Sequence, residues 1–332
     1  MIWYIYVTRS HHASVSTVCA VMRTGVGLIF ISRYLLMPCK PPKTYLEQIK
    51  VLVEEHGLAV EDEQRAVVYL QRLNYYHLRG YYIHWMDRDQ KTFNDGISFE
   101  MVIALHHFDE RLKLLLWPLL LGIELQLRTS IAYHLAHKYG PLSYLDETCF
   151  LDPVLANESK ELILSKIQKS SELFAKHYRQ KYNGELPIWG VVELLSFGSL
   201  SKVFQNLKQE DKSQLALECY GLDGELVNSY IHSLLCVRNI CAHNGRLYNR
   251  RLPTPVKISS ANQKLIDERV SPTFKVYPNN LYAMLFAIKD MAPPEEFSSF
   301  LSQLEELLLE YRAIIDLTRL GMPYTWKIVL SC

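Results

Sequence analysis

Apolar residues along the chain recur mainly at the three- and four-residue spacing that is typical of amphipathic helices. A first helix is predicted directly after Thr44, which forms a capping box with Glu47. The helical pattern that starts at Ser98 continues for about forty residues, and Trp117-Pro118 is expected to kink or divide it. Further helices are predicted over residues 61–73, 157–182, 187–198, 199–207, 212–220, 226–243, 280–289 and 294–317.

The predicted fold class is all-α, a multi-helix bundle with additional N-terminal and C-terminal helices, because no alternating strand pattern persists. Residues 41–253 are expected to form the main helical domain. Residues 254–332 are expected to form a loop and helices that pack on the same body. The apolar run from Leu114 to Ile123 is about half as long as a bilayer span requires, which favours a buried core helix and no stable membrane partner.

The first 36 residues are expected to be a poorly structured or non-native extension, with translation starting at Met37. The alternative is a signal or anchor segment over residues 13–31, which are fairly apolar. Arg23 interrupts that stretch, and no convincing cleavage pattern follows it.

Composition describes an ordinary folded protein of 332 residues, with 49% hydrophobic residues and a formal charge of +1. Near-neutrality argues against a histone-like or ribosomal protein coated in positive charge. The seven cysteines are scattered without a Cys-x-x-Cys pair, so neither a zinc knuckle nor a disulfide framework is indicated. This cysteine usage favours a reducing, cytoplasmic compartment.

The most informative segment is the end of the helix predicted over residues 226–243. At 100° per residue, Arg238 falls within an arc of apolar positions, where a buried guanidinium needs an anionic partner or a phosphate. Asn239 and His243 lie on a neighbouring polar stripe with His232. Gly245 is the expected helix stop, which puts His243 in the last turn, where the helix dipole favours its protonated form.

A guanidinium, a carboxamide and an imidazole at one helix end suit metal-free RNA cleavage. The imidazole of His243 can take the proton from a ribose 2′-hydroxyl or give one to the leaving oxygen. Arg238 can donate two parallel hydrogen bonds to the phosphate, and Asn239 can orient the imidazole ring or contact the phosphate. The alternative interpretation is a core salt bridge with a capping histidine.

Several segments resemble the Abi family of bacterial abortive-infection proteins, of the AbiD/AbiF-like type. The Arg-x4-His pattern of Arg238 and His243 also resembles the HEPN (higher eukaryotes and prokaryotes nucleotide-binding) signature. The blocks that carry the family resemblance are residues 75–81 (YYHLRGY), 108–112 (FDERL), 123–128 (IELQLR), 187–198 (PIWGVVELLSFG) and 234–250 (LLCVRNICAHNGRLYNR). The similarity runs from about Pro41 to Pro253.

This resemblance implies an all-helical, HEPN-like ribonuclease of phage defence that needs no cofactor and works as a homodimer. An RNA or protein antitoxin is a further implied partner. The alternatives are a non-catalytic RNA-binding protein and a protein-interaction component of a defence or toxin–antitoxin system. The assigned residues are Arg238, His243 and Asn239 for catalysis, Arg246, Tyr248, Arg250 and Asn244 for RNA binding, and Glu124, Arg128 and Glu193 in support.

Three acidic positions and one histidine pair leave alternatives open. Glu124 and Arg128 are most simply an intrahelical ion pair, although one of them can instead face the site and fix Arg238. Glu193 is a second candidate to offset Arg238. His106-His107 with Asp109 suggests a metal, but adjacent residues point about 100° apart on a helix, so no metal site is predicted.

Overall fold

The computed structural model describes residues 3–8, 17–24, 27–34, 41–87 and 89–331. Its N-terminal part is an antiparallel sheet of β1 (Trp3–Thr8), β2 (Thr17–Thr24) and β3 (Gly27–Tyr34), in that order. These strands lie within the 36 residues expected to be a poorly structured or non-native extension, and that expectation stays a prediction. Their β-branched and aromatic residues favour strands, but the apolar residues sit at consecutive positions and give no alternating pattern.

The body of the protein is all-α, as predicted. Its helices are α1 (Tyr45–Lys50), continued by a π-helical segment (Val51–Glu55), α2 (Glu63–Arg72), α3 (Tyr75–Tyr82), α4 (Phe99–Tyr139), α5 (Pro153–Lys169), α6 (Leu173–Lys181), α7 (Ile188–Leu194), α8 (Phe197–Gln205), α9 (Gln209–Tyr220), α10 (Gly224–Ala242), α11 (Ser260–Arg269), α12 (Leu281–Met291), α13 (Pro294–Glu310) and α14 (Trp326–Leu330). The capping box of Thr44 and Glu47 is present at α1.

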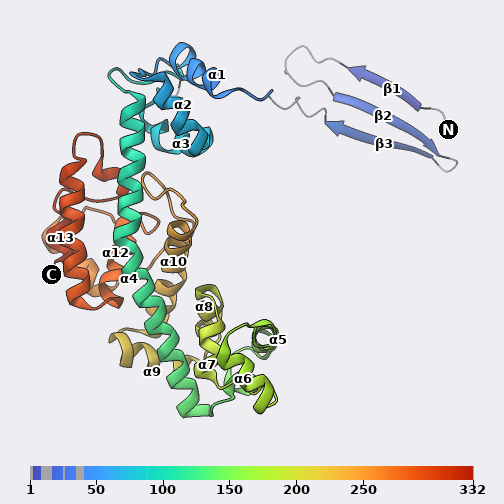
Figure 1. Cartoon of the computed structure of the whole chain (residues 1–332), viewed down its shortest axis with the longest axis vertical. Coiled ribbons are helices and arrows are strands. Elements are labelled where there is room, and N and C mark those ends of the chain that lie inside the picture. Colours follow the sequence, from blue (N-terminus) through green and yellow to red (C-terminus); the bar gives the residue numbers. More distant parts are fainter. Residues whose placement is uncertain (1–2, 9–16, 25–26, 35–40, 88, 332) are drawn as a thin grey trace.

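The axis of the body is α4, a single helix of 41 residues (Figure 1). The helices α1 to α3 lie near its N-terminal end, and α5 to α7 lie near its C-terminal end. Along its middle, α4 packs against α10, α12 and α13, and α10 also contacts α12. The C-terminal helices therefore share one core with the segment that carries the candidate site.

Helix boundaries differ from the predicted ones at several places, and the helix predicted over residues 294–317 ends at Glu310. The long helix continues through Pro118, with Leu116, Leu119 and Leu120 buried around it. Residues 157–182 form two helices, because Ser170 leaves the helical conformation and its hydroxyl accepts from the amide of Glu172. Gly198 lies inside α8 rather than at a helix end, because Ser196 caps that helix.

By length and composition α4 is apolar enough to cross a membrane, a test that core helices of other proteins also pass. It carries the buried Asp109, Lys113 and Glu124, and it packs against helices along its length. Buried charges facing other helices are typical of a core helix. The cytoplasmic location stays a prediction.

Candidate functional site

The C-terminal end of α10 is closed by two backbone hydrogen bonds. The amide of Asn244 donates to the Cys241 carbonyl at 3.3 Å, and that of Gly245 donates to the Ile240 carbonyl at 2.7 Å. The residue in the left-handed conformation is Asn244, with φ of +51°, and not the predicted Gly245. At Gly245 space is tight, because a Cβ there would lie 3.1 Å from the side chain of Ile240 and 3.3 Å from its carbonyl oxygen. His243 is the last residue before this turn.

The guanidinium of Arg238 is half-buried against α4. Its Nε donates to Oε2 of Glu124 at 3.1 Å, and the other carboxylate oxygen accepts from Arg128 Nη2 at 3.0 Å. Glu124 therefore serves both the intrahelical pair and the fixing of Arg238, two roles that the sequence left as alternatives. The Glu124 side chain is 8% exposed and that of Arg238 is 24% exposed, so the pair is partly shielded from solvent screening.

Glu193, the second acid expected to offset Arg238, does not contact it. The Glu193 side chain is 51% exposed and lies 3.5 Å from Arg128. It lies in the last turn of the short helix α7, which packs beside α4 at the level of Arg128. An exposed ion pair of this length contributes little to stability.

The Arg238 guanidinium is turned toward the polar stripe of α10. Its Nη1 donates to Oδ1 of Asn239 at 3.2 Å, and its central carbon lies 5.9 Å from the ring centroid of Trp117. Asn239 shares a face of α10 with His243, whereas Arg238 and His243 are about 140° apart around the helix axis. The hydrogen bond to Asn239 thus links the cation to the face that bears the imidazole.

The imidazole of His243 is exposed, as is that of His232 about three turns earlier on the same stripe. Asn239 and Cys236 between them are half-exposed. The stripe is therefore open to a ligand or a partner. The arrangement offers a fixed cation, an amide and an accessible imidazole at one helix end, which suits binding of an anionic ester and proton transfer near neutral pH.

The segment after α10 is held by the buried carboxylate of Asp109 on α4. Asp109 accepts from the amides of Leu247 and Tyr248, at 3.0 and 2.6 Å, and from the Tyr81 hydroxyl at 2.8 Å. Lys113 lies 3.6 Å away. Burial raises the pKa of Asp109, and these donors act in the opposite direction. This role of Asp109 was missed in the sequence, although the spacing of Asp109 and Lys113 on a core helix is a signal of a buried ion pair.

Three of the residues assigned to ligand binding make contacts that hold this segment in place, and their binding role stays a prediction. Arg246 donates to the carbonyls of Tyr248 and Asn249 and lies over the Tyr81 ring, and burial lowers the pKa of its guanidinium. Tyr248 is fully buried, and its hydroxyl accepts from the amide of Asp316. Asn244 Oδ1 accepts from Lys113 Nζ at 2.6 Å.

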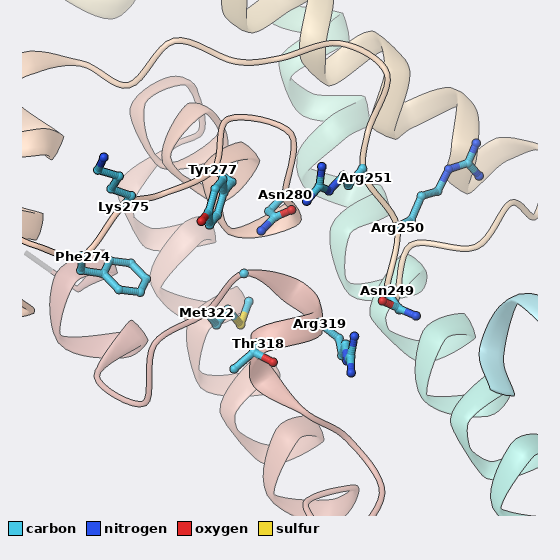
Figure 2. Close-up of a pocket in the computed structure, with 11 residues that line it drawn as sticks. Asn249, Arg250, Arg251, Phe274, Lys275, Tyr277, Asn280, Thr318, Arg319 and Met322 are labelled. Carbon is cyan, nitrogen blue, oxygen red and sulfur yellow. The ribbon is translucent and has the colours of Figure 1, made fainter. Parts of the chain in front are cut away.

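Arg250, the fourth residue assigned to ligand binding, is half-exposed beside the end of α10. Its Nη1 lies 3.4 Å from the Arg246 carbonyl oxygen. It also borders a pocket of about 370 Å³, although its side chain points away from the hollow (Figure 2). The pocket is lined by eleven residues, including Arg250, Arg251, Lys275 and Arg319, and none of them is acidic. This positive lining favours an anion.

A stripe of exposed apolar side chains runs along α4 next to the Arg238 site. It consists of Leu114, Pro118, Leu121 and Leu125, and we call it the α4 stripe; its leucines are 69%, 40% and 59% exposed. Their spacing of four, three and four residues places them on one face of the helix. Trp117 and Glu124, which contact Arg238, each lie one position before a member of the α4 stripe. Such a face is typical of a helix that packs on another protein surface.

Comparison with known proteins gives one match. The model of a protein family described as "Abi-like protein" matches residues 68–249, which include α3, α4 and all of α10. No significant match was found among curated proteins or solved structures. The matched range contains Arg238, Asn239 and His243 together with the α4 residues that hold them.

Proposed function

The chain belongs to the Abi-like protein family, and we propose that it is an endoribonuclease of bacterial phage defence with a HEPN-type site. The proposal concerns Arg238, Asn239 and His243, with RNA as the substrate. The single observation that carries it is the position of the Arg238 guanidinium. Glu124 fixes it from α4, and Asn239 links it to the face that presents the exposed His243.

The proposed reaction is transfer of the phosphodiester to the neighbouring 2′-oxygen. The ribose 2′-hydroxyl loses a proton to an imidazole, its oxygen bonds to phosphorus, and the 5′-oxygen leaves with a proton from an acid. The products are a 2′,3′-cyclic phosphate and a 5′-hydroxyl. Arg238 stabilises the negative charge that grows on the phosphate oxygens, because its guanidinium is already held in place. Every step uses protein groups, so no resident cofactor is proposed.

A homodimer would supply the second imidazole, because one His243 cannot serve as base and acid in the same turnover without exchanging its proton. The α4 stripe supports this assembly. A second copy packed along the stripe would cover its exposed leucines and bring the neighbouring Arg238 sites of both copies to one interface. The 140° between Arg238 and His243 on one helix also favours a site that combines residues of two copies.

We expect the double substitution Leu121→Glu with Leu125→Glu to separate the dimer and to reduce cleavage. Each buried leucine contributes about 1.5–3 kcal/mol, so the loss of two should weaken association by at least about 100-fold. Light scattering across a range of concentrations measures this shift. Leu173→Glu on α6, where the leucine is 82% exposed, is the matched control and should stay dimeric. A wild-type protein that is monomeric while cleaving RNA contradicts the prediction.

We expect Glu124→Gln to lower the cleavage rate while Glu193→Gln leaves it nearly unchanged. The glutamine keeps the size of the side chain but removes the charge that fixes Arg238. A hydrogen bond to a charged group contributes about 1.5–3 kcal/mol, which corresponds to a rate loss of about 10-fold to 100-fold. Initial cleavage rates of both purified variants, compared with wild type at equal thermal stability, give the measurement. Equal losses in both variants would speak against the role of Glu124.

The proposal as a whole is tested by the ends of the RNA. Purified wild-type protein is incubated with structured and single-stranded RNAs in a buffer without added divalent ions, and the new termini are identified by enzymatic end-labelling. The expected termini are a 2′,3′-cyclic phosphate and a 5′-hydroxyl. RNA that is bound with unchanged termini identifies a non-catalytic RNA-binding protein instead. A 5′-phosphate product overturns the proposed mechanism.

A further inference from the structure

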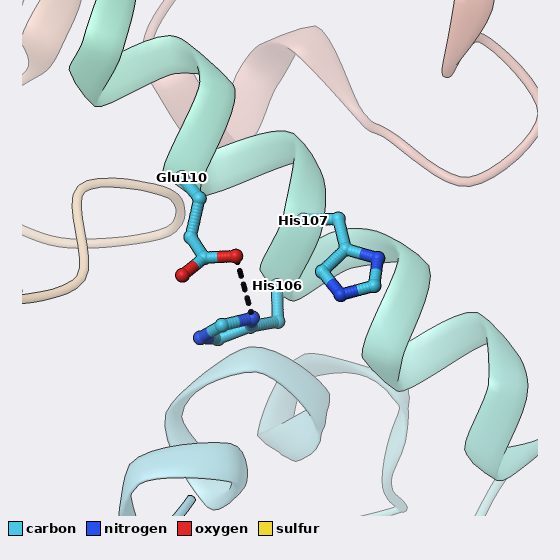
Figure 3. Close-up of side chains that lie close together, drawn as sticks. All are labelled: His106, His107 and Glu110. Atoms are coloured by element: carbon cyan, nitrogen blue, oxygen red, sulfur yellow. Dashed lines mark ion pairs between the residues drawn. The ribbon is translucent and has the colours of Figure 1, made fainter. Parts of the chain in front are cut away.

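Three side chains with metal-ligating atoms lie together on one turn of α4, away from the Arg238 site. They are His106, His107 and Glu110, and one potential ligand atom of each lies within 4.8 Å of the other two (Figure 3). On a helix Glu110 falls about 40° from His106 and about 60° from His107, so the carboxylate reaches between the two rings. The sequence interpretation took Asp109 as the third group, but Asp109 faces the segment after α10.

The imidazole of His106 is buried without a hydrogen-bond partner among the described residues. The residue is 2% exposed, and neither of its ring nitrogens makes a hydrogen bond. Its Nδ1 forms an ion pair with Oε2 of Glu110 at 3.4 Å, without the alignment of a hydrogen bond (Figure 3). Buried polar atoms are normally hydrogen-bonded, so this buried ring points to a ligand beside it.

A third histidine borders the same space from α3. The ring of His77 lies 5.4 Å from that of His106, and its Nε2 is also buried without a hydrogen-bond partner. The three close ligand atoms of α4 do not include one from His77, which borders that group from the neighbouring helix α3.

We propose that His106, His107 and Glu110 bind one divalent transition-metal ion, with zinc as the best fit and His77 as the additional ligand from α3. Two or three imidazoles with one carboxylate are ligands that zinc prefers in proteins, in a four-coordinate site. Magnesium and calcium are disfavoured because they require mainly oxygen ligands. The site lies outside the RNA-cleavage chemistry, and the ion joins α3 to α4.

The charges around the group are compatible with a bound cation. Lys113, whose charge acts on His106 and His77, is paired with Asp109 at 3.6 Å, which reduces its repulsion of the ion. Glu110 supplies the negative charge.

Zinc binding to the full-length protein tests the site. The protein is freed of metal with a chelator and titrated with Zn²⁺ against a chromophoric competitor, and Co²⁺ absorption reports the geometry of the ligands. We expect one ion per chain in a four-coordinate site and a higher melting temperature with zinc. Glu110→Gln and His107→Gln should weaken binding by at least about tenfold, because even partners outside the ligand set cost about 10-fold to 100-fold.

These two variants are chosen because both side chains are partly exposed, so the fold tolerates their replacement. His137→Gln, at an exposed histidine near the other end of α4, is the matched control and should bind zinc as the wild type does. Zinc affinity that is unchanged in Glu110→Gln and His107→Gln, or a wild-type protein that takes up no stoichiometric zinc or cobalt, overturns the proposal. The measurement does not depend on RNA cleavage.

Discussion

Replacing His243 by alanine is expected to lower the rate of RNA cleavage by about 100-fold to 10,000-fold, the range that general acid–base catalysis contributes. The imidazole is exposed at the end of α10 and outside the core, so the melting temperature should change little. The measurement is the initial rate on a fluorescently labelled RNA, with circular dichroism to verify the fold. His232→Ala is the matched control, because His232 is exposed on the same stripe of α10.

The same residue allows a sharper test of a site shared between two copies. A mixed dimer of one wild-type and one His243→Ala subunit is expected to be nearly as slow as the His243→Ala homodimer. It holds a single imidazole at the interface, whereas the proposed mechanism needs one as base and one as acid. If each copy worked alone, the mixed dimer would keep about half of the wild-type rate. Cleavage by pure His243→Ala at the wild-type rate would exclude His243 as a catalytic residue.

Replacing Asp109 by alanine is expected to produce the largest loss of stability, about 3–5 kcal/mol, because it leaves a buried lysine without its charge partner. The substitution also removes the acceptor for two backbone amides and the Tyr81 hydroxyl. Asp109→Asn should lose less, since it keeps one acceptor oxygen. Urea unfolding followed by circular dichroism gives the free-energy difference.

The control for this prediction is Asp95→Ala, in an exposed loop, which should change stability by less than about 0.5 kcal/mol. The loop after α10 should also become more accessible to protease in Asp109→Ala, because its amides at Leu247 and Tyr248 lose their acceptor. An Asp109→Ala protein as stable as wild type would contradict the role given to this carboxylate.

The helical periodicity of the sequence predicted the body of the fold well, because local spacing of apolar residues decides which face of a helix is buried. It placed Arg238 near the apolar face of α10 and His243 at its end, and both positions agree with the structure. The strands β2 and β3 were missed because consecutive apolar residues carry no period that separates a strand from other structures.

The binding residues were predicted less well, because side-chain direction in an irregular segment has no sequence period. Arg246 and Tyr248 looked like surface residues of an arginine-rich loop, yet the loop turns inward onto Asp109, and both side chains pack against α3 or the C-terminal part of the chain. Asn244 is exposed and Arg250 is half-exposed, and neither makes a contact that excludes the assigned role.

By itself the sequence determined the helical class, the end of α10 and the chemical types gathered there, since all of these follow from neighbours a few residues apart. Tertiary structure decided which groups meet. Glu124 and not Glu193 fixes Arg238, although the two residues are 114 positions apart in the sequence, and Glu110 and not Asp109 lies close to the two histidines of α4. The physical reason is that contacts at long separation depend on how whole helices pack, and the spacing of residues within a single helix carries no record of that packing.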